Sequence, residues 1–390
     1  MPTQTLLSCQ KARFQLSPDV TYLNGAYMSP LLKSVEEAGI EGLRKKRNPA
    51  QLGHQEFFED VDNVRQLFAR IINVTDYQRI ALLPSVSYGM AIVAKNVSIS
   101  AGDNIVVVGE QFPSNVYCWQ KLAAQHRATL KTVEAPHSPE GRGAKWNERL
   151  LEAIDDRTKL VSIAHFHWSD GTRFDLATLR QRTQDVGCWL VVDGTQSVGA
   201  YPFDAQEMRP DALVCAGYKC LMGPYGTTLA YFGDAFDEGQ PLDEGWCNRY
   251  GSDDFTNLVR YQDRYQPGAL RYDMGERSNF VAVPMMRQAL QEVTDWGVKN
   301  IQHYCETLVT PFVEHLSDTD YRFESPQYRA NHLFGLRLPD YISLTSLQNA
   351  LETAKISVSV RGNSVRISPH VYNELVDLEQ LSDCLRDVVA

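Results

Sequence analysis

Short apolar runs alternate with amphipathic stretches through the first two thirds of the chain. Runs typical of strands cover residues 79–84, 104–109, 160–166 and 188–193, and a fifth begins at residue 212. Stretches with helical spacing lie between them, over residues 88–96, 114–125 and 175–186. Strands that alternate with helices in this way predict an α/β fold with a mostly parallel sheet covered by helices.

The pattern changes beyond about residue 284. Helical stretches cover residues 285–296, 298–316 and 344–354, a last helix begins at residue 374, and strand-like runs cover residues 333–338, 356–360 and 364–367. This order is typical of a smaller α+β domain. We therefore expect a large domain over residues 26–284, a small C-terminal domain over residues 285–390, and an N-terminal segment, residues 1–25, that packs with the small domain.

Charge and composition narrow the class of protein. The net charge is −10 and no basic cluster is longer than residues 44–47, whereas nucleic-acid binding relies on many lysine and arginine side chains. We interpret this basic cluster as the solvated end of a helix. No apolar run approaches the roughly 18–20 residues that span a bilayer, and residues 1–11 lack the apolar core of a signal peptide. The eight cysteines have no CxxC spacing, so we expect a reduced, cytoplasmic enzyme without a bound metal.

Lys219 is the only charged side chain between Asp211 and Asp234. Such apolar surroundings disfavour the ammonium form, lower the pKa of the amine and leave a nucleophile that attacks carbonyl carbons. Upstream, the apolar run over residues 188–192 leads directly into Asp193. A pyridoxal phosphate (PLP) site requires both features. The lysine holds the cofactor aldehyde as a Schiff base, and the carboxylate keeps the pyridine nitrogen protonated.

Four candidate side chains follow the ends of predicted strands. They are Ser87, Phe112, Asp193 and Lys219. In mostly parallel sheets, ligands bind at the carboxyl ends of the strands. All four are therefore expected at the ligand-binding edge of the sheet.

With these residues assembled, the chain resembles the class V branch of fold-type I PLP-dependent enzymes, which includes kynureninases, cysteine desulfurases and related aminotransferases. The resemblance rests on residues 192–199, which read VDGTQSVG, and on Gly217-Tyr218-Lys219 at the family's spacing. It extends from about residue 22 to the C-terminal helix. It implies the fold-type I architecture, PLP as the cofactor and an amino acid as the substrate.

The resemblance also implies cofactor contacts. Asp193 would pair with the pyridine nitrogen, and Gln196 would hydrogen-bond the phenolic oxygen. Val86 and Ser87, which open a helix after a strand, would bind the phosphate. For Gln196 the alternative is a helix cap.

Two aromatic residues complete the implied cofactor site. Phe112 would stack on the cofactor ring, as in kynureninases, although a core aromatic is the alternative. Tyr218 occupies a position from which kynureninases contact the phosphate.

Substrate contacts follow from the same resemblance. Residues 364–373 resemble the segment whose arginine binds the substrate α-carboxylate, a role that suits a planar bidentate donor and falls on Arg366. Arg361 is expected to help, and Tyr27 belongs to a segment that often closes over the substrate.

A short strand-end segment supplies further candidates. His165 and His167 share one strand face and, with Trp168, are candidates for lining the site. A structural role fits the two histidines equally well.

PLP sites of this family lie at a dimer interface, so a homodimer is expected. Gly245-Trp246 resembles the kynureninase pair that lies near the partner's cofactor. Within residues 271–279, Glu276 falls where the family donates a Thr or Asn to the partner's phosphate, and phosphate would repel a carboxylate. Either this contact moves to Ser278 or Asn279, or the loop has another role.

The reaction is narrowed by residues that are missing. Desulfurases need a nucleophilic cysteine on a loop of the small domain, and residues 362–364 contain none. Kynureninases carry a histidine where this chain has Gln196. The first hypothesis is therefore an aminotransferase acting on a small amino acid. The alternative is a PLP-dependent lyase or epimerase, either kynureninase-like or a C–S lyase.

A third hypothesis is a non-catalytic PLP-binding protein. The joint presence of Asp193, Lys219 and Arg366 disfavours it, because a silent relative need not keep all three.

Overall fold

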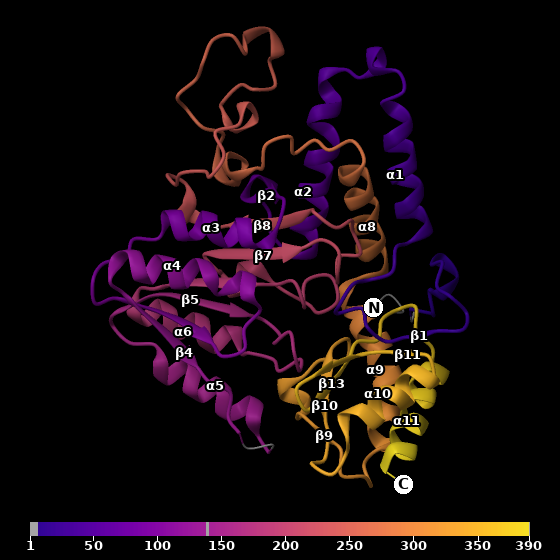
Figure 1. The fold of residues 1–390 in the computed structure, drawn as a ribbon. Coiled ribbons are helices and arrows are strands. Elements are labelled where there is room, and N and C mark those ends of the chain that lie inside the picture. The colour runs from indigo at the N-terminus through magenta and orange to yellow at the C-terminus, as the bar shows by residue number, and fades with distance from the viewer. Residues whose placement is uncertain (1–6, 138–139, 390) are drawn as a thin grey trace, which may run out of the picture.

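The computed structural model describes residues 7–137 and 140–389, and a seven-stranded sheet is its main element (Figure 1). The strand order is β2-β8-β7-β6-β5-β3-β4, and β8 runs in the direction opposite to the other six strands. The strands are β2 (Ile80–Leu83), β3 (Asn104–Val108), β4 (Thr129–Val133), β5 (Thr158–Ala164), β6 (Trp189–Asp193), β7 (Ala212–Ala216) and β8 (Thr228–Phe232). The predicted mostly parallel sheet is confirmed.

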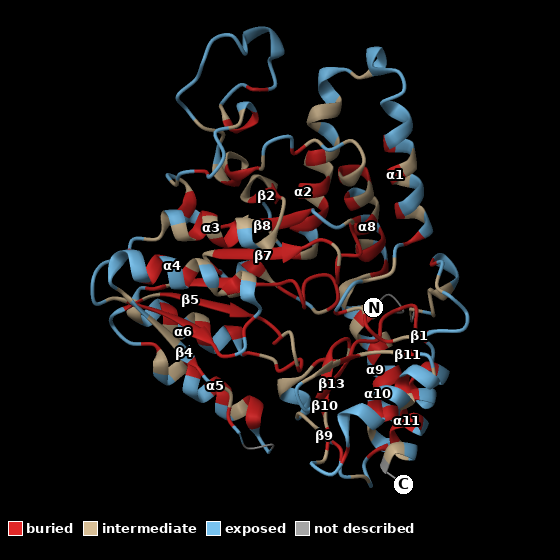
Figure 2. Ribbon diagram, viewed as in Figure 1, coloured by how far each residue is buried: buried red, intermediate tan, exposed pale blue. Residues whose placement is uncertain are grey.

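Helices cover both faces of this sheet (Figure 1). They are α1 (Lys33–Lys45), α2 (Glu59–Ile71), α3 (Val86–Asn96), α4 (Tyr117–His126), α5 (Arg142–Ala153), α6 (Leu176–Val186), α7 (Ala205–Met208) and α8 (Ala282–Trp296). The central strands are buried, whereas the outward faces of the helices are exposed (Figure 2). Within the described residues, no helix is long and apolar enough to cross a membrane.

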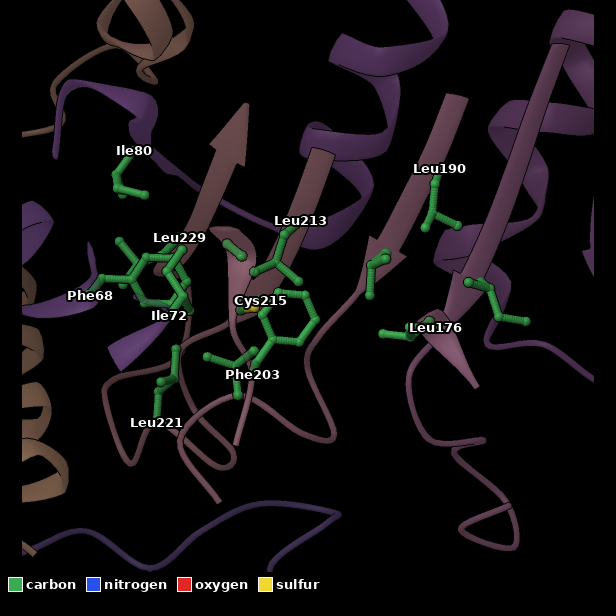
Figure 3. Packing of buried hydrophobic residues seen from close by; sticks show 14 of the residues in the cluster. Phe68, Ile72, Ile80, Leu176, Leu190, Phe203, Leu213, Cys215, Leu221 and Leu229 are labelled. Carbon is green, nitrogen blue, oxygen red and sulfur yellow. The ribbon is translucent and has the colours of Figure 1, made fainter. Parts of the chain in front are cut away.

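Alternate residues of the central strands enter two separate apolar cores. On one face, Ile80, Leu229 and Leu213 pack with Phe68 of α2 (Figure 3). The next residues along the strands, such as Ala81 and Val214, enter the core beneath α3 and α4. Because both faces are covered, these strands read as continuous apolar runs.

The C-terminal part is built on a second, antiparallel sheet of order β12-β13-β10-β9. Its strands are β9 (Arg322–Phe323), β10 (Phe334–Arg337), β12 (Ser359–Arg361) and β13 (Ser364–Ile367). The helices α9 (Val298–His315), α10 (Leu344–Thr353) and α11 (Leu375–Val389) contribute to the apolar core on this sheet. This arrangement confirms the predicted α+β unit.

The N-terminal segment joins this unit through a parallel pair of β1 (Thr21–Tyr22) and β11 (Ile356–Ser357). The prediction of one strand over residues 356–360 is wrong, because β11 and β12 belong to different sheets. The partner of β11 lies more than 300 residues earlier in the chain, and a local pattern does not reveal it. The domain boundaries at residues 25 and 284 stay a prediction.

Candidate active site

A cavity of about 200 Å³ lies at the carboxyl ends of the parallel strands. Its lining comes from the segments that follow β2, β3, β5, β6 and β7, as expected for a sheet of this type. The structure brings together in this lining the four side chains that follow strand ends in the sequence. They are Ser87, Phe112, Asp193 and Lys219.

Lys219 lies in a tight turn after β7 and is 7% exposed. Its Nζ atom is 5.7 Å from the ring centroids of both Phe112 and Tyr218. Burial, followed by the positive charge of Arg366, lowers the pKa of Lys219 to about 8, while Asp193 acts in the opposite direction. A substantial fraction of this amine is therefore neutral near physiological pH, as a nucleophile or a base requires.

Asp193 is the last residue of β6 and is buried. Its Oδ1 atom accepts a hydrogen bond of 3.0 Å from the backbone N–H of Thr195, whose own Oγ1 accepts one of 3.1 Å from Ala216. Burial raises the pKa of the Asp193 carboxyl, and its hydrogen bonds with Thr195 oppose this shift. A buried carboxylate of this kind favours a cationic partner in the cavity.

The N-terminus of α3 faces the same cavity. Ser85 caps the helix, because its Oγ accepts from the N–H of Tyr88 at 3.2 Å. The N–H groups of Val86 and Ser87, in the first turn, have no intrahelical acceptor. The hydroxyls of Ser85 and Ser87 lie 2.9 Å apart. Both serines and Val86 line the cavity. Free N–H groups, a helix dipole and two hydroxyls suit an anion such as phosphate.

Gln196 lies on the cavity wall with a buried amide. Its Nε2 donates to the carbonyl of Ala26 at 3.1 Å, whereas Oε1 is buried without a partner in the described residues. The main-chain oxygen of Gln196 is 2.7 Å from Nε2 of His332. The sequence interpretation missed His332, and no local signal marks it, because this contact joins residues 136 positions apart.

Aromatic side chains form one side of the cavity. Phe112 is 38% exposed and lies edge-on to Trp168, with ring centroids 5.6 Å apart. Tyr218 packs against Tyr225 with centroids 4.6 Å apart. An exposed aromatic face above the lysine and the carboxylate is suited to a flat ring.

The segment after β5 places its residues alternately. Ala164, Phe166 and Trp168 line the cavity, and His165 and His167 do not. His165 packs on Tyr201, and His167 packs on Trp146 with centroids 4.9 Å apart. The two histidines share one side of the segment, as predicted, but that side packs against the protein interior. Of the three candidates, Trp168 is the one that lines the cavity.

Arg366 extends from β13 and is 2% exposed. Its Nη1 donates to the carbonyl of Trp168 at 2.6 Å and its Nη2 to the hydroxyl of Ser359 at 3.2 Å, while Nε has no partner in the described residues. Arg361, at the end of β12, lies over the Trp168 ring at 5.6 Å. Tyr27 is 57% exposed and is not among the residues that line the cavity.

Trp246 and Glu276 lie together at a second cavity, which shares no lining residue with the first. Trp246 is 41% exposed and packs against Phe255 with ring centroids 5.5 Å apart. The hydroxyl of Ser278 donates to the carbonyl of Phe57, and the side-chain oxygen of Asn279 accepts from the N–H groups of Val281 and Ala282. Both alternatives to Glu276 are thus engaged within their own chain.

Comparison with known proteins agrees with this architecture. The model of the family Aminotransferase class-V matches residues 23–384. The Uncharacterized aminotransferase YcbU of Bacillus subtilis (strain 168) is 25% identical over 336 residues, which cover 84% of each chain. A Cysteine desulfurase of Escherichia coli (strain K12 / DH10B) is 28% identical over 275 residues, which cover 70% of this chain and 65% of that protein.

Two solved structures show the same fold. The cystine C-S lyase C-DES, in complex with cysteine persulfide, superposes with a TM-score of 0.82 at 19% identity and covers 95% of this chain and 98% of its own. The apo cysteine desulfurase of Thermococcus onnurineus NA1 gives a TM-score of 0.81 at 21% identity and covers 100% and 99%. The fold class predicted from the sequence is confirmed, and the chain belongs to the aminotransferase class-V family.

Proposed function

We propose that the cavity at Lys219 is a PLP site in which the enzyme acts on the α-carbon of an amino acid, most simply as an aminotransferase. The observation that carries this proposal is the joint placement of three features in one cavity. A buried amine of lowered pKa, a buried carboxylate at the end of β6 and the free N-terminus of α3 all face the same space.

The residues present fit PLP. Asp193 supplies an anion for the pyridinium nitrogen, and the α3 terminus supplies N–H groups for the phosphate. Two amide atoms in the cavity lining are buried without a hydrogen-bond partner among the described residues. They are Oε1 of Gln196 and Nε2 of Gln111. Buried polar atoms in folded proteins are generally satisfied, so these two amides support a polar ligand at this wall. Phe112 would cover the ring of the cofactor.

When bound, PLP supplies an electron sink that withdraws charge from the α-carbon of the substrate. Lys219 would hold the cofactor and, once displaced, move the proton at the α-carbon. Its lowered pKa leaves part of the amine unprotonated near neutral pH, as a base requires. Asp193 would keep its ionic partner protonated, and the aromatic wall would exclude water from the reacting atoms.

Arg366 is proposed to bind the substrate α-carboxylate. Its two hydrogen bonds to the protein fix the guanidinium plane, and unused N–H groups remain for a planar anion. The charge of Arg366 contributes to the lowered pKa of Lys219, which supports a short separation between the two groups. An amino acid held by Arg366 would therefore present its α-carbon close to the Lys219 amine.

Among the residues that the structure describes, no cysteine lines the cavity, which supports transamination over persulfide chemistry of the usual kind. Cys220 follows Lys219, but burial raises the pKa of this thiol to about 12. Burial also raises the pKa of Cys247, which lies beside Trp246 in the second cavity. A thiol of raised pKa is a poor nucleophile at neutral pH. A lyase or epimerase that needs no catalytic cysteine remains the alternative reaction.

We further infer a homodimer in which the Trp246 segment reaches the partner's site. Trp246 lies away from the Lys219 cavity of its own chain, so any contact with a cofactor must be made across an interface.

A cytoplasmic location is also proposed, because all eight cysteines are free thiols, as is usual in a reducing compartment.

The test is the visible absorption spectrum of the purified protein, before and after addition of pooled amino acids. An aminotransferase would lose the band of the bound aldehyde in proportion to the keto acid formed. A lyase or epimerase would retain the aldehyde form of the cofactor while product accumulates. Protein that neither contains PLP nor takes it up would refute the proposal, as would a Lys219→Ala variant with an unchanged visible band.

A further inference from the structure

Two guanidinium groups flank Trp168 without a carboxylate partner. Among the residues that the structure describes, neither Arg361 nor Arg366 forms a salt bridge. The Nε atom of each is buried and has no hydrogen-bond partner. Buried or half-buried cations are normally paired, so this pair calls for anions from outside the chain.

The two arginines are held in different ways. Arg366 is fixed by the carbonyl of Trp168 and the hydroxyl of Ser359. In the part of the chain that the structure describes, Arg361 donates to the carbonyl of Val360 in its own strand and lies over the Trp168 ring. Stacking on an indole keeps a guanidinium planar while its edge stays free for hydrogen bonds. Trp168 itself is held by its Nε1–H, which donates to the carbonyl of Glu110 at 2.7 Å.

The charges at this wall do not balance. Burial, followed by the charge of Arg361, lowers the pKa of Arg366 to about 10, which shows that the two cations are close enough to repel each other. Asp193 is the only carboxylate among the described residues that line the Lys219 cavity, and it is proposed to pair with the cofactor. The two arginines adjoin that lining through Trp168 and are not part of it, and Arg361 also borders a separate cavity with Glu352. One substrate carboxylate would neutralise Arg366 and leave Arg361 uncompensated.

We propose that the substrate carries a second anionic group on its side chain, of carboxylate type, and that Arg361 binds it beside the Trp168 ring. This inference rests on the proposed function and narrows its substrate class to acidic amino acids. Arg366 keeps the α-carboxylate, because it is the more buried and the more firmly held of the two. A cationic side chain would meet two arginines and no free carboxylate, so basic amino acids are excluded as good substrates.

Unreactive acids test this inference separately from catalysis. Glutarate and pentanoate have the same carbon chain and differ by one carboxylate. Calorimetric titration of the PLP-loaded protein should show that glutarate binds at least about tenfold more tightly, the effect of one additional charge-assisted contact. Arg361→Gln should abolish this difference and leave the affinity for pentanoate unchanged. Arg70→Gln, which removes an exposed arginine of α2, is the matched control and should preserve the difference.

Equal affinities of the wild-type protein for the two acids would overturn the inference, as would an Arg361→Gln variant that weakens both equally. If the Arg361→Gln variant does not fold, two measurements still test the inference. They are the comparison of glutarate with pentanoate on the wild-type protein and the same comparison on Arg361→Lys, which keeps the charge. A protein that turns over L-glutamine as well as L-glutamate would retain the proposed function and lose this inference. A protein that binds glutarate but takes up no PLP would fail the proposed function instead.

Discussion

The Nε2 atom of His332 lies 2.7 Å from the main-chain oxygen of Gln196. A carbonyl oxygen only accepts hydrogen bonds, so Nε2 carries the proton, and Nδ1 accepts from the side-chain amide of Gln302 at 2.8 Å. Burial lowers the pKa of His332 to about 4, in keeping with this neutral form. His332, which precedes β10, therefore connects Gln302 of α9 with the segment that follows Asp193 at the end of β6.

Loss of this donor should loosen the cofactor. His332→Ala would leave the buried carbonyl of Gln196 without a partner, which typically costs about 1–3 kcal/mol. We expect PLP affinity, measured from the visible band, to fall about tenfold.

The matched variant is His332→Gln, whose amide can donate from nearly the same position as Nε2. It should keep PLP affinity within about threefold of the wild type. If both variants lost affinity equally, the packing of the ring and not its proton would be the cause, and the hydrogen bond would have no special role.

The lowered pKa of Lys219 makes the stability of the cofactor-free protein depend on pH. Between pH 8 and the ordinary lysine value of 10.5, the unfolded chain holds a proton on this amine that the folded chain lacks. The free energy of unfolding therefore rises with pH across this window. Below pH 8 the folded protein carries the full destabilisation that comes from burying a charged amine. Lys219→Met removes that cost, so its stability advantage over the wild type should shrink by about 3 kcal/mol between pH 7.5 and 10.5.

Urea unfolding of both cofactor-free proteins at a series of pH values measures this difference. Other titrating groups are common to the two proteins and cancel in the comparison. An advantage that stays constant across the window would mean that the Lys219 amine is solvated in the folded chain, contrary to its burial.

The packing of α1 against the segment before α8 depends on a glycine. A Cβ added at Gly42 would lie 2.0 Å from the main-chain oxygen of Phe280, and a backbone atom cannot move aside cheaply. At Gly39, in the same helix, the nearest atom is the sulfur of Met285 at 2.8 Å, on a flexible side chain.

Gly42→Ala should therefore lower the free energy of unfolding by about 2 kcal/mol, despite the better helix propensity of alanine. Gly39→Ala should change it by less than about 1 kcal/mol. Denaturant titration of the two variants compares them directly, and equal effects would show that the segment before α8 yields as readily as a methionine.

The sequence reveals those elements whose environment repeats along the chain. Strands β5, β6 and β7 are buried on both faces and appear as apolar runs, and Lys219 and Asp193 stand out because they interrupt such runs. Strand β4, with the sequence TLKTV, lies at the sheet edge with exposed side chains, so no apolar run marks it. Helix α1 packs through Gly39 and Gly42, which read as breakers in a sequence.

Contacts between distant segments are hidden from sequence for a different reason. The period-two pattern puts His165 and His167 on one side of the chain, but it does not say which side faces the cavity. Tyr201 and Trp146, which belong to other elements, pack against the two histidines. Trp168 therefore lies on the side that faces the cavity. The unpaired state of Arg361 depends in the same way on what surrounds it in space.

The proposed homodimer leads to a prediction by complementation. Lys219 and Trp246 line separate cavities of one chain, so a dimer that exchanges the Trp246 segment builds each site from two subunits. Lys219→Ala and Trp246→Ala should each be nearly inactive as homodimers. Mixed dimers contain one site with both residues intact, and random mixing of equal amounts should restore about one quarter of wild-type activity.

The control is a Lys219→Ala/Trp246→Ala double variant mixed with the Lys219→Ala protein, in which every site lacks the lysine. It should restore nothing, since no arrangement of its subunits yields an intact site. If the first mixture restored no activity although differential tagging demonstrated mixed dimers, Trp246 would act within its own subunit. The loop between β8 and α8, which projects from the sheet (Figure 1), would then serve a purpose other than completing the partner's site.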